Sequence, residues 1–221
     1  MARSYTAKEF KKALKKWGVN ATYYEGWDSA AIDPFGVSPS MGIVVHHTAN
    51  GGAKGNNPSV YWQAEGNEYA PIRAAHVNIG RDGLVTVLAA RGAYHAGAGG
   101  PVTIGSGVVP VNQGNKFLFG VELESKGTSA STTAKVTDVD GITPEQVESF
   151  TRLACALCEL MDVDDKSILR HADWTDGGPK FGGPWLPTRG RKNDTLVPTT
   201  FWRKAVKRRR LTSRIKGLFG R

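Results

Sequence analysis

The sequence predicts an α/β fold, a single domain in which helices flank a central mixed β-sheet. Two short apolar segments, Gly42–Val45 and Lys116–Leu123, are typical of buried strands. Segments with apolar residues at helical spacing alternate with such strands, which favours a sheet covered by helices. The 221 residues, 40% of them hydrophobic, suffice to bury one core.

Local signals place the individual elements. Thr6 with Glu9 forms a capping box that opens the first helix, and Thr143 with Gln146 opens the longest one. The sequence Gly80–Gly83 separates two apolar segments and predicts a β-hairpin. The predicted elements, in chain order, are a helix from Thr6, a loop over 20–41, a strand over 42–45, a helix over 60–69, strands over 76–79 and 84–88, a loop over 96–115, a strand over 116–123, a helix over 144–161 and a short strand over 168–171.

The positive charge is concentrated near the C-terminal end. The chain carries 29 Lys and Arg against 20 Asp and Glu, a formal net charge of +9. Residues 203–221 hold nine of the basic residues and no acidic one, so residues 1–202 are formally neutral. A neutral body argues against a nucleic-acid-binding domain, which carries its basic patch on the folded surface.

Three interpretations of this basic tail stay open. It forms a helix docked on the body with solvated arginines, or an amphipathic basic segment, or a nucleic-acid-binding arm. The second is supported by apolar residues at spacings of four, seven and eight, namely Leu211, Ile215, Leu218 and Phe219. Such a segment binds an anionic wall polymer or a membrane surface by charge. The third lacks interleaved aromatic residues.

Other classes are excluded by simple patterns. No stretch approaches 18 consecutive apolar residues, so no membrane-spanning helix is expected. The first 18 residues carry lysines at helical spacing and do not resemble a secretory signal. The chain has two cysteines, Cys155 and Cys158, and both lie within the predicted helix over 144–161. They are therefore expected to be buried, reduced thiols rather than a redox or zinc motif.

The histidines and one glutamate indicate a hydrolytic site. Histidines end two predicted strands, at His46 and His171, and Glu122 lies inside an apolar one. A carboxylate in such a strand is costly unless it is paired or faces a cleft. Two neutral imidazoles and one carboxylate form the protein ligands of a hydrolytic zinc site, with the fourth position left to water.

Five motifs, in order, resemble one family. They are Ile43–Ala49 (IVVHHTA), Ala75–Gly83 (AHVNIGRDG), Tyr94–Gly97 (YHAG), Gly120–Glu124 (GVELE), and His171 followed by Gly190–Asp194 (GRKND). The chain resembles the zinc-dependent N-acetylmuramoyl-L-alanine amidases of the amidase-2 type, which share their fold with peptidoglycan recognition proteins. The resemblance covers roughly residues 40 to 202. Without a secretory signal, the chain looks most like a bacteriophage endolysin.

The resemblance implies a role for each matching residue. His46, His171 and Asp194 correspond to the ligands of one zinc ion, Glu122 to the general base and Lys192 to a catalytic cation. Asp194 lies 23 positions after His171, which exceeds the family's usual separation, so an inserted loop is expected. Asp173 and Asp176 stay open as alternative third ligands.

Further residues receive weaker assignments. His95 and Tyr94 correspond to positions that line the substrate groove, although Trp usually precedes this histidine. His76 is either a substrate contact or a core histidine. The remaining assignments are His47 pointing away from the metal, Glu124 as a structural acid and Asp82 as a turn residue.

The resemblance implies a phage lysis enzyme that cuts the amide bond between N-acetylmuramic acid and L-alanine in peptidoglycan. The expected units are residues 1–40, a helix and loop packing on the catalytic domain; 41–202, the zinc amidase domain; and 203–221, the basic tail. Expected partners are peptidoglycan, an anionic wall polymer or membrane surface, and a holin, with no nucleic acid. The expected location is the host cytoplasm, then the cell wall during lysis. Two alternatives stay open, a non-catalytic peptidoglycan-binding module and an intracellular amidase that recycles muropeptides.

Overall fold

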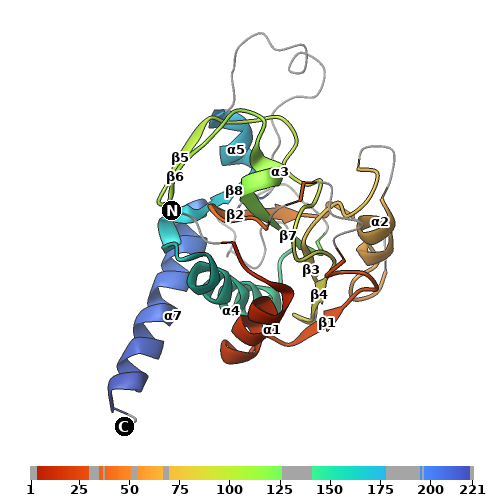
Figure 1. Ribbon diagram of the computed structural model, residues 1–221. Helices are drawn as coiled ribbons and strands as arrows, with labels where there is room; N and C mark the ends of the chain where they lie inside the picture. Colours follow the sequence, from red (N-terminus) through yellow and green to blue (C-terminus); the bar gives the residue numbers. More distant parts are fainter. Residues whose placement is uncertain are drawn as a thin grey trace.

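The computed structural model (Figure 1) describes most of the chain. The described residues are 4–29, 35–36, 38–50, 54–66, 70–125, 141–177, 195 and 197–219, with the backbone alone for 176–177 and 216–219.

The centre of the molecule is a mixed β-sheet, as the sequence predicts. Within the described residues it has six strands in the order β1-β4-β3-β7-β2-β8. Neighbouring strands are parallel except for the β3–β4 hairpin. A separate two-stranded sheet joins β5 and β6. The strands are β1 Ala21–Tyr23, β2 Gly42–His47, β3 Val77–Ile79, β4 Val85–Val87, β5 Val102–Ile104, β6 Gly107–Val109, β7 Leu118–Leu123 and β8 Ile168–Arg170.

Helices cover the sheet on both sides, and the predicted capping boxes begin two of them. Thr6 caps α1 and Thr143 caps α4, each with its side chain accepting from the backbone N–H three residues on. Pro144 occupies the first turn of α4, where it has no hydrogen bond to lose. The helices are α1 Ala7–Lys16, α2 Val60–Glu65, α3 Gly114–Phe117, α4 Pro144–Met161, the 3₁₀ turn η3 Asp165–Ser167, α5 His171–Gly177 and α7 Thr199–Phe219.

The two faces of the sheet have different surroundings. Alternation along β2 turns Ile43 and Val45 to one face, where α1, α4 and α7 bury them in the main core. Val44 and His46 point to the other face, on which α5, α3 and the β5–β6 hairpin lie (Figure 1). His46, a candidate site residue, therefore stands on the face opposite the largest core.

Two loop predictions are wrong. Residues 96–115 were expected to lack secondary structure, yet they contain β5, β6 and the start of α3. The expected loop over 20–41 contains β1, which pairs with the edge of the sheet at β4. Each of these strands has three residues, too few for an alternating apolar pattern to be visible in the sequence.

The prediction for the cysteines is confirmed. Cys155 and Cys158 are free and buried within α4. Burial raises the pKa of each thiol to about 12, so both remain protonated and unreactive at neutral pH. None of the described helices is both long and apolar enough to cross a membrane.

Candidate active site

Strand register brings three of the predicted residues into one row. In the parallel pairing of β2 with β7, His46 lies opposite Glu122. On the other side of β2, Val45 pairs with Arg170 of β8, so the next residues along, His46 and His171, are also neighbours. Paired residues of parallel strands project to the same face, so the row Glu122–His46–His171 crosses the carboxyl ends of three adjacent strands.

The two histidines of this row face each other directly. The Nδ1 atoms of His46 and His171 are 3.0 Å apart, and both side chains are buried. Their rings meet edge to face, with centroids 4.4 Å apart. Since neither ring is turned to solvent, the hydrogen-bond partners of the other ring nitrogens decide where each ring carries its proton.

Backbone carbonyls fix these protons. His171 Nε2 lies 3.0 Å from the carbonyl oxygen of Ala96, which only accepts, so Nε2 carries the hydrogen. His95 Nε2 likewise donates to the carbonyl of Leu118 at 2.8 Å. This leaves His95 Nδ1 to accept from His46 Nε2 at 3.1 Å. In the neutral rings, the two facing Nδ1 atoms of His46 and His171 therefore carry no hydrogen.

This arrangement suits a cation. Two unprotonated imidazole nitrogens 3.0 Å apart repel each other unless they share a proton or a metal ion. Two nitrogen ligands of a tetrahedral zinc ion, each about 2.0 to 2.1 Å from the metal, lie roughly 3.3 Å apart. The spacing and tautomers of His46 and His171 thus fit a pair of metal ligands. The outward-facing N–H groups are held by a carbonyl and by His95, as is typical of ligating histidines.

His95 depends on two residues that the sequence analysis did not single out. Its ring lies against Gly120, where an added Cβ would come within 2.3 Å of His95 Cγ. Asn115 Oδ1 accepts from the backbone N–H groups of His95 at 2.9 Å and Ala96 at 2.6 Å. Burial and the neighbouring imidazoles hold the pKa of His95 well below its usual value, so the ring is neutral. A glycine inside an apolar strand was the available signal, because it marks close approach by another group.

His76 is placed as a core histidine. Its Nδ1 accepts from the backbone N–H of Gly120 at 2.9 Å, and its Nε2 donates to the carbonyl of Arg91. The side chain is fully buried and stacks on Phe119. Burial lowers the pKa of His76 to about 3. Of the two alternatives that the sequence leaves open for His76, this geometry matches the structural one.

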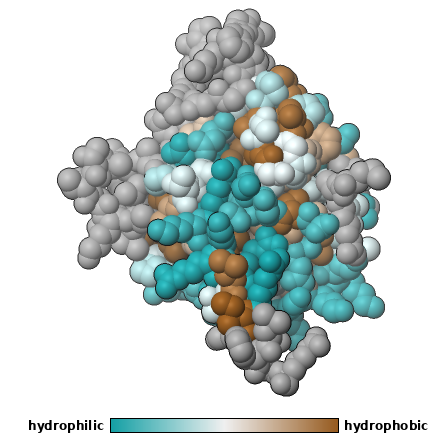
Figure 2. All heavy atoms as spheres, turned by 90° about the vertical axis from the view of Figure 1, so that its left-hand side faces the viewer, coloured by the Kyte–Doolittle hydropathy of each residue, from teal (hydrophilic) through white to brown (hydrophobic). Residues whose placement is uncertain are grey.

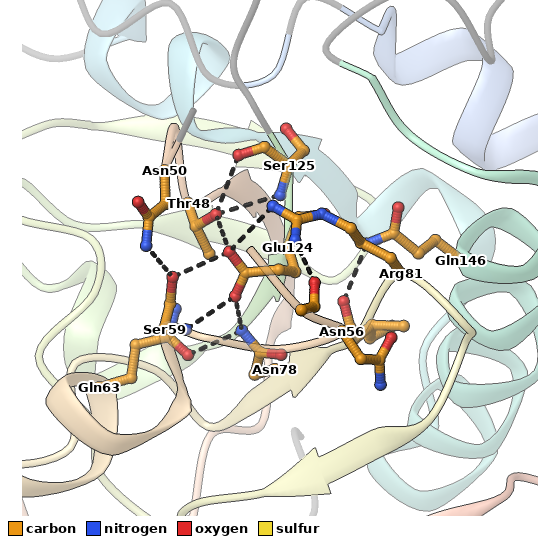
Figure 3. Close-up of polar contacts among 12 residues, drawn as sticks. Thr48, Asn50, Asn56, Ser59, Gln63, Asn78, Arg81, Glu124, Ser125 and Gln146 are labelled. Atoms are coloured by element: carbon orange, nitrogen blue, oxygen red, sulfur yellow. Dashed lines mark hydrogen bonds and ion pairs between the residues drawn. The ribbon is translucent and has the colours of Figure 1, made fainter. Parts of the chain in front are cut away.

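Glu124 organises the loops beyond the row (Figure 3). Its side chain is fully buried, and the residue follows directly after the end of β7, two positions beyond Glu122. One carboxylate oxygen accepts from the hydroxyls of Thr48 and Ser59, and the other from the backbone N–H of Ser59 and the amide of Asn78. The donors come from the end of β2, the start of α2 and β3. The carboxylate therefore ties together the segments that surround Glu122 and His46.

Arg81 adds a charge to this network, and the turn beside it forms as predicted. Its guanidinium lies 4.0 Å from Glu124 Oε1. Asp82 Oδ1 accepts from the backbone N–H of Leu84 at 2.8 Å, and Gly83 has φ of 83°. Asp82 thus serves the turn.

The remaining candidate ligands divide into two groups. Asp173 is engaged elsewhere, since Arg170 donates to its Oδ1 at 2.7 Å and Thr199 donates to its Oδ2. Burial raises the pKa of Asp173, but these hydrogen bonds outweigh burial and lower it. Lys192 and Asp194, and the side chain of Asp176, lie outside the described residues. Within the described residues, no three His, Cys, Asp or Glu side chains are grouped to hold a metal ion.

A comparison with protein families identifies the fold. The family model described as N-acetylmuramoyl-L-alanine amidase (Amidase_2) matches residues 37–187. This chain belongs to that family. The match includes His46, Glu122 and His171 and ends before Asp194. As a member of the family, the protein is an N-acetylmuramoyl-L-alanine amidase, and its substrate is peptidoglycan.

Solved structures similar to this amidase are distant in sequence. The catalytic domain of XlyA is 15% identical, with a TM-score of 0.49 over 85% of this chain and 99% of that one. A selenomethionine AmpD derivative is 20% identical, with a TM-score of 0.48 over 76% and 89% of the two chains. The endolysin amidase LysCS from Clostridium intestinale URNW is 19% identical, with a TM-score of 0.40 over 62% and 71%. No curated protein matches the amidase in sequence.

Proposed function

We propose that this amidase hydrolyses the bond between N-acetylmuramic acid and L-alanine with the help of one zinc ion held by His46, His171 and Asp194. The observation that supports this most is that the unprotonated Nδ1 atoms of His46 and His171 face each other beside Glu122. Asp194 enters the proposal through the family motif alone. Asp173 is disfavoured because its carboxylate already binds Arg170 and Thr199.

Zinc held there would supply Lewis acidity, which would lower the pKa of a water molecule towards about 7 and polarise the substrate carbonyl. Glu122 lies next to His46 in the strand register, and we assign it as the general base that takes the proton from the attacking water. It then delivers this proton to the L-alanine nitrogen as the amide bond breaks. Lys192 is proposed to stabilise the negative charge that develops on the carbonyl oxygen.

The protein environment supports this use of the histidines. His95 holds the hydrogen on Nε2 of His46 and so presents Nδ1 to the metal. His47 follows His46 in β2 and therefore points to the opposite face. Tyr94 is half-buried next to His95 in the sequence, and we propose it as a substrate contact.

We further propose that the amidase is a bacteriophage lysis enzyme that acts on the intact wall. The basic outward surface of α7 supports a role at the cell envelope, which is anionic. An enzyme that acts on soluble muropeptides does not need to bind such a surface. A lysis enzyme should release ends from intact sacculi at least as fast as from soluble muropeptides of equal concentration. A preference for the soluble substrate would favour the recycling amidase instead.

The test of the chemistry is end-group analysis of purified peptidoglycan digested with zinc, with a chelator and with the Glu122→Gln variant. New amino groups of L-alanine should appear with zinc and disappear with the chelator. Glu122→Gln should lower the rate by roughly 10²- to 10⁴-fold, the usual contribution of a general base.

Glu145→Gln is the matched control, because Glu145 is exposed in the first turn of α4 and far from β7 in sequence. It should leave the rate unchanged. If the wild-type protein binds the wall but releases no L-alanine ends with zinc present, the protein is a binding module and the proposal fails. If activity resists the chelator, the zinc assignment fails while the amidase assignment stands.

A further inference from the structure

One half of α7 is fastened to the body through its inner face. Trp202 and Val206 are buried in the main core, and Trp202 packs edge to face on Phe150 of α4. Arg209 donates to both carboxylate oxygens of Glu148 at 2.7 Å. Arg210 also donates a hydrogen bond to the carbonyl oxygen of Val163. These contacts fix the orientation of the helix relative to the sheet.

The opposite side of α7 is exposed and combines cations with apolar groups. We call this side the outer face of α7, and it consists of Lys204, Lys207, Arg208, Leu211, Arg214 and Ile215. Residues 204, 208, 211 and 215 are separated by four, three and four positions and so lie along one line of the helix. Leu211 is 50% exposed and Ile215 is 54% exposed. Figure 2 shows a hydrophobic strip over the lower part of this helix, with hydrophilic surface beside it.

The outer face carries a concentrated positive charge. Residues 203–221 contain no acidic residue. Within the part of the chain that the structure describes, the ion pair formed by α7 is that of Arg209 on the inner face. The helix also extends away from the body towards its C-terminal end (Figure 1), so a flat surface can approach the outer face without meeting the sheet.

We propose that the outer face of α7 binds the surface of an anionic lipid bilayer. A helix of this kind lies in the plane of the interface, with its cations at the lipid headgroups and its apolar residues at the acyl boundary. In this position the basic side chains contact lipid headgroups and the apolar side chains contact acyl chains. A soluble anionic polymer would pair with the cations but would leave Leu211 and Ile215 in water, so the exposed apolar residues favour lipid.

The test is flotation of the 221-residue protein with vesicles of phosphatidylglycerol and phosphatidylethanolamine, and with vesicles of phosphatidylcholine alone. Binding should occur with the anionic vesicles and should weaken as salt is raised. The triple variant Lys204→Gln, Lys207→Gln, Arg208→Gln should bind roughly 100-fold more weakly.

A second variant, Leu211→Ser with Ile215→Ser, keeps every charge and should bind roughly 30-fold more weakly. Its matched control is Val108→Ser with Val111→Ser, which removes apolar side chains of similar exposure, 56% and 41%, from another part of the surface. The control should bind like wild type. Because all these side chains are exposed, circular dichroism should show unchanged folding.

Three results would overturn the proposal. Equal binding to both kinds of vesicle would show that charge has no part in it. Unchanged vesicle binding by the Leu211→Ser, Ile215→Ser variant, with retention on a soluble polyanion, would assign the outer face to an acidic polymer. If wild type is a dimer and this variant is a monomer, the outer face is an interface between two copies of the chain. None of these readouts depends on catalysis, so they are independent of the proposed amidase chemistry.

Discussion

On one face of the sheet, Ile43 and Val45 pack beneath α1, α4 and α7, whereas on the other face of the same strand His46 stands beside Glu122. The first face is held by apolar burial, which is non-directional and spread over many side chains. The second face has a smaller apolar cluster around Val44 and Trp174, but its histidines are held by hydrogen bonds that fix individual atoms, such as the link from Leu118 through His95 to His46.

The difference between the faces separates stability from chemistry. The apolar face should tolerate shifts of a few tenths of an ångström, because its free energy depends mainly on buried area. The polar face should not, because a ring nitrogen either faces its partner or does not. Substitutions on the two faces are therefore expected to change different measured quantities.

The largest effect is expected from Phe150→Ala on the apolar face. Phe150 of α4 is fully buried against Trp202 of α7, with ring centroids 4.6 Å apart. The truncation should lower the free energy of unfolding by about 4 kcal/mol, measured by urea denaturation. The zinc affinity of the folded protein should change by less than about 3-fold, since Phe150 lies in the main core, on the opposite face of the sheet from His46. A large loss of zinc affinity in the folded variant would contradict the separation of the two faces.

A smaller effect on stability is expected from Glu124→Ala on the polar face. The truncation leaves the buried donors of Ser59, Thr48 and Asn78 without their acceptor and should cost about 3 kcal/mol in urea denaturation. Unlike Phe150→Ala, it should also lower the amidase rate of the folded protein, because the loops around Glu122 lose their common anchor. Glu145→Gln on the surface serves as the control. An unchanged rate would show that the network stabilises the fold only.

The sequence predicted much of this arrangement. The helix over 144–161 was expected within its observed bounds because Thr143, Pro144 and Gln146 are strong local signals. The strands that carry His46 and Glu122 were predicted from apolar segments long enough to recognise. The three-residue strands β1, β5 and β6 were missed because their pairing depends on partners distant in the sequence.

The contacts of the site were harder to predict. The sequence indicates that His46, Glu122 and His171 end or occupy strands, but only the strand order makes them neighbours. The contact of His95 with His46 depends on the absent side chain of Gly120, which the motif alone does not explain. The direction of the hydrogen bonds made by the histidine rings could not be predicted from the sequence, because it depends on which backbone carbonyl each ring contacts.

A third prediction concerns the contact between His95 and His46. His95→Phe keeps a ring of similar size but removes the acceptor for His46 Nε2–H, so the apparent zinc affinity should fall roughly 10- to 100-fold. It is measured by competition with a chromophoric chelator, which requires no substrate. His95→Gln offers both an acceptor and a donor and should restore much of the affinity. Equal affinities in all three proteins would show that His95 does not position His46.

The smallest effect is a pH dependence of stability that arises from His76. The pKa of this histidine is about 3 in the folded protein and near 6.5 when exposed, so below pH 6.5 the unfolded chain binds one proton more. The free energy of unfolding should therefore be unaffected by His76 above pH 6.5 and fall by about 1.4 kcal/mol per pH unit as the pH decreases to 5.

Urea denaturation of wild type and His76→Gln between pH 7 and 5, with a chelator present, isolates this contribution. The buried His95 adds a slope of the same sign to both proteins, so the difference between the two slopes belongs to His76. His76 is thus expected to affect the fold, whereas its neighbour His95 contacts His46, a proposed zinc ligand. Parallel slopes for the two proteins would mean that His76 is protonated as readily in the fold as in the unfolded chain, and its hydrogen bonds to Gly120 and Arg91 would then need another explanation.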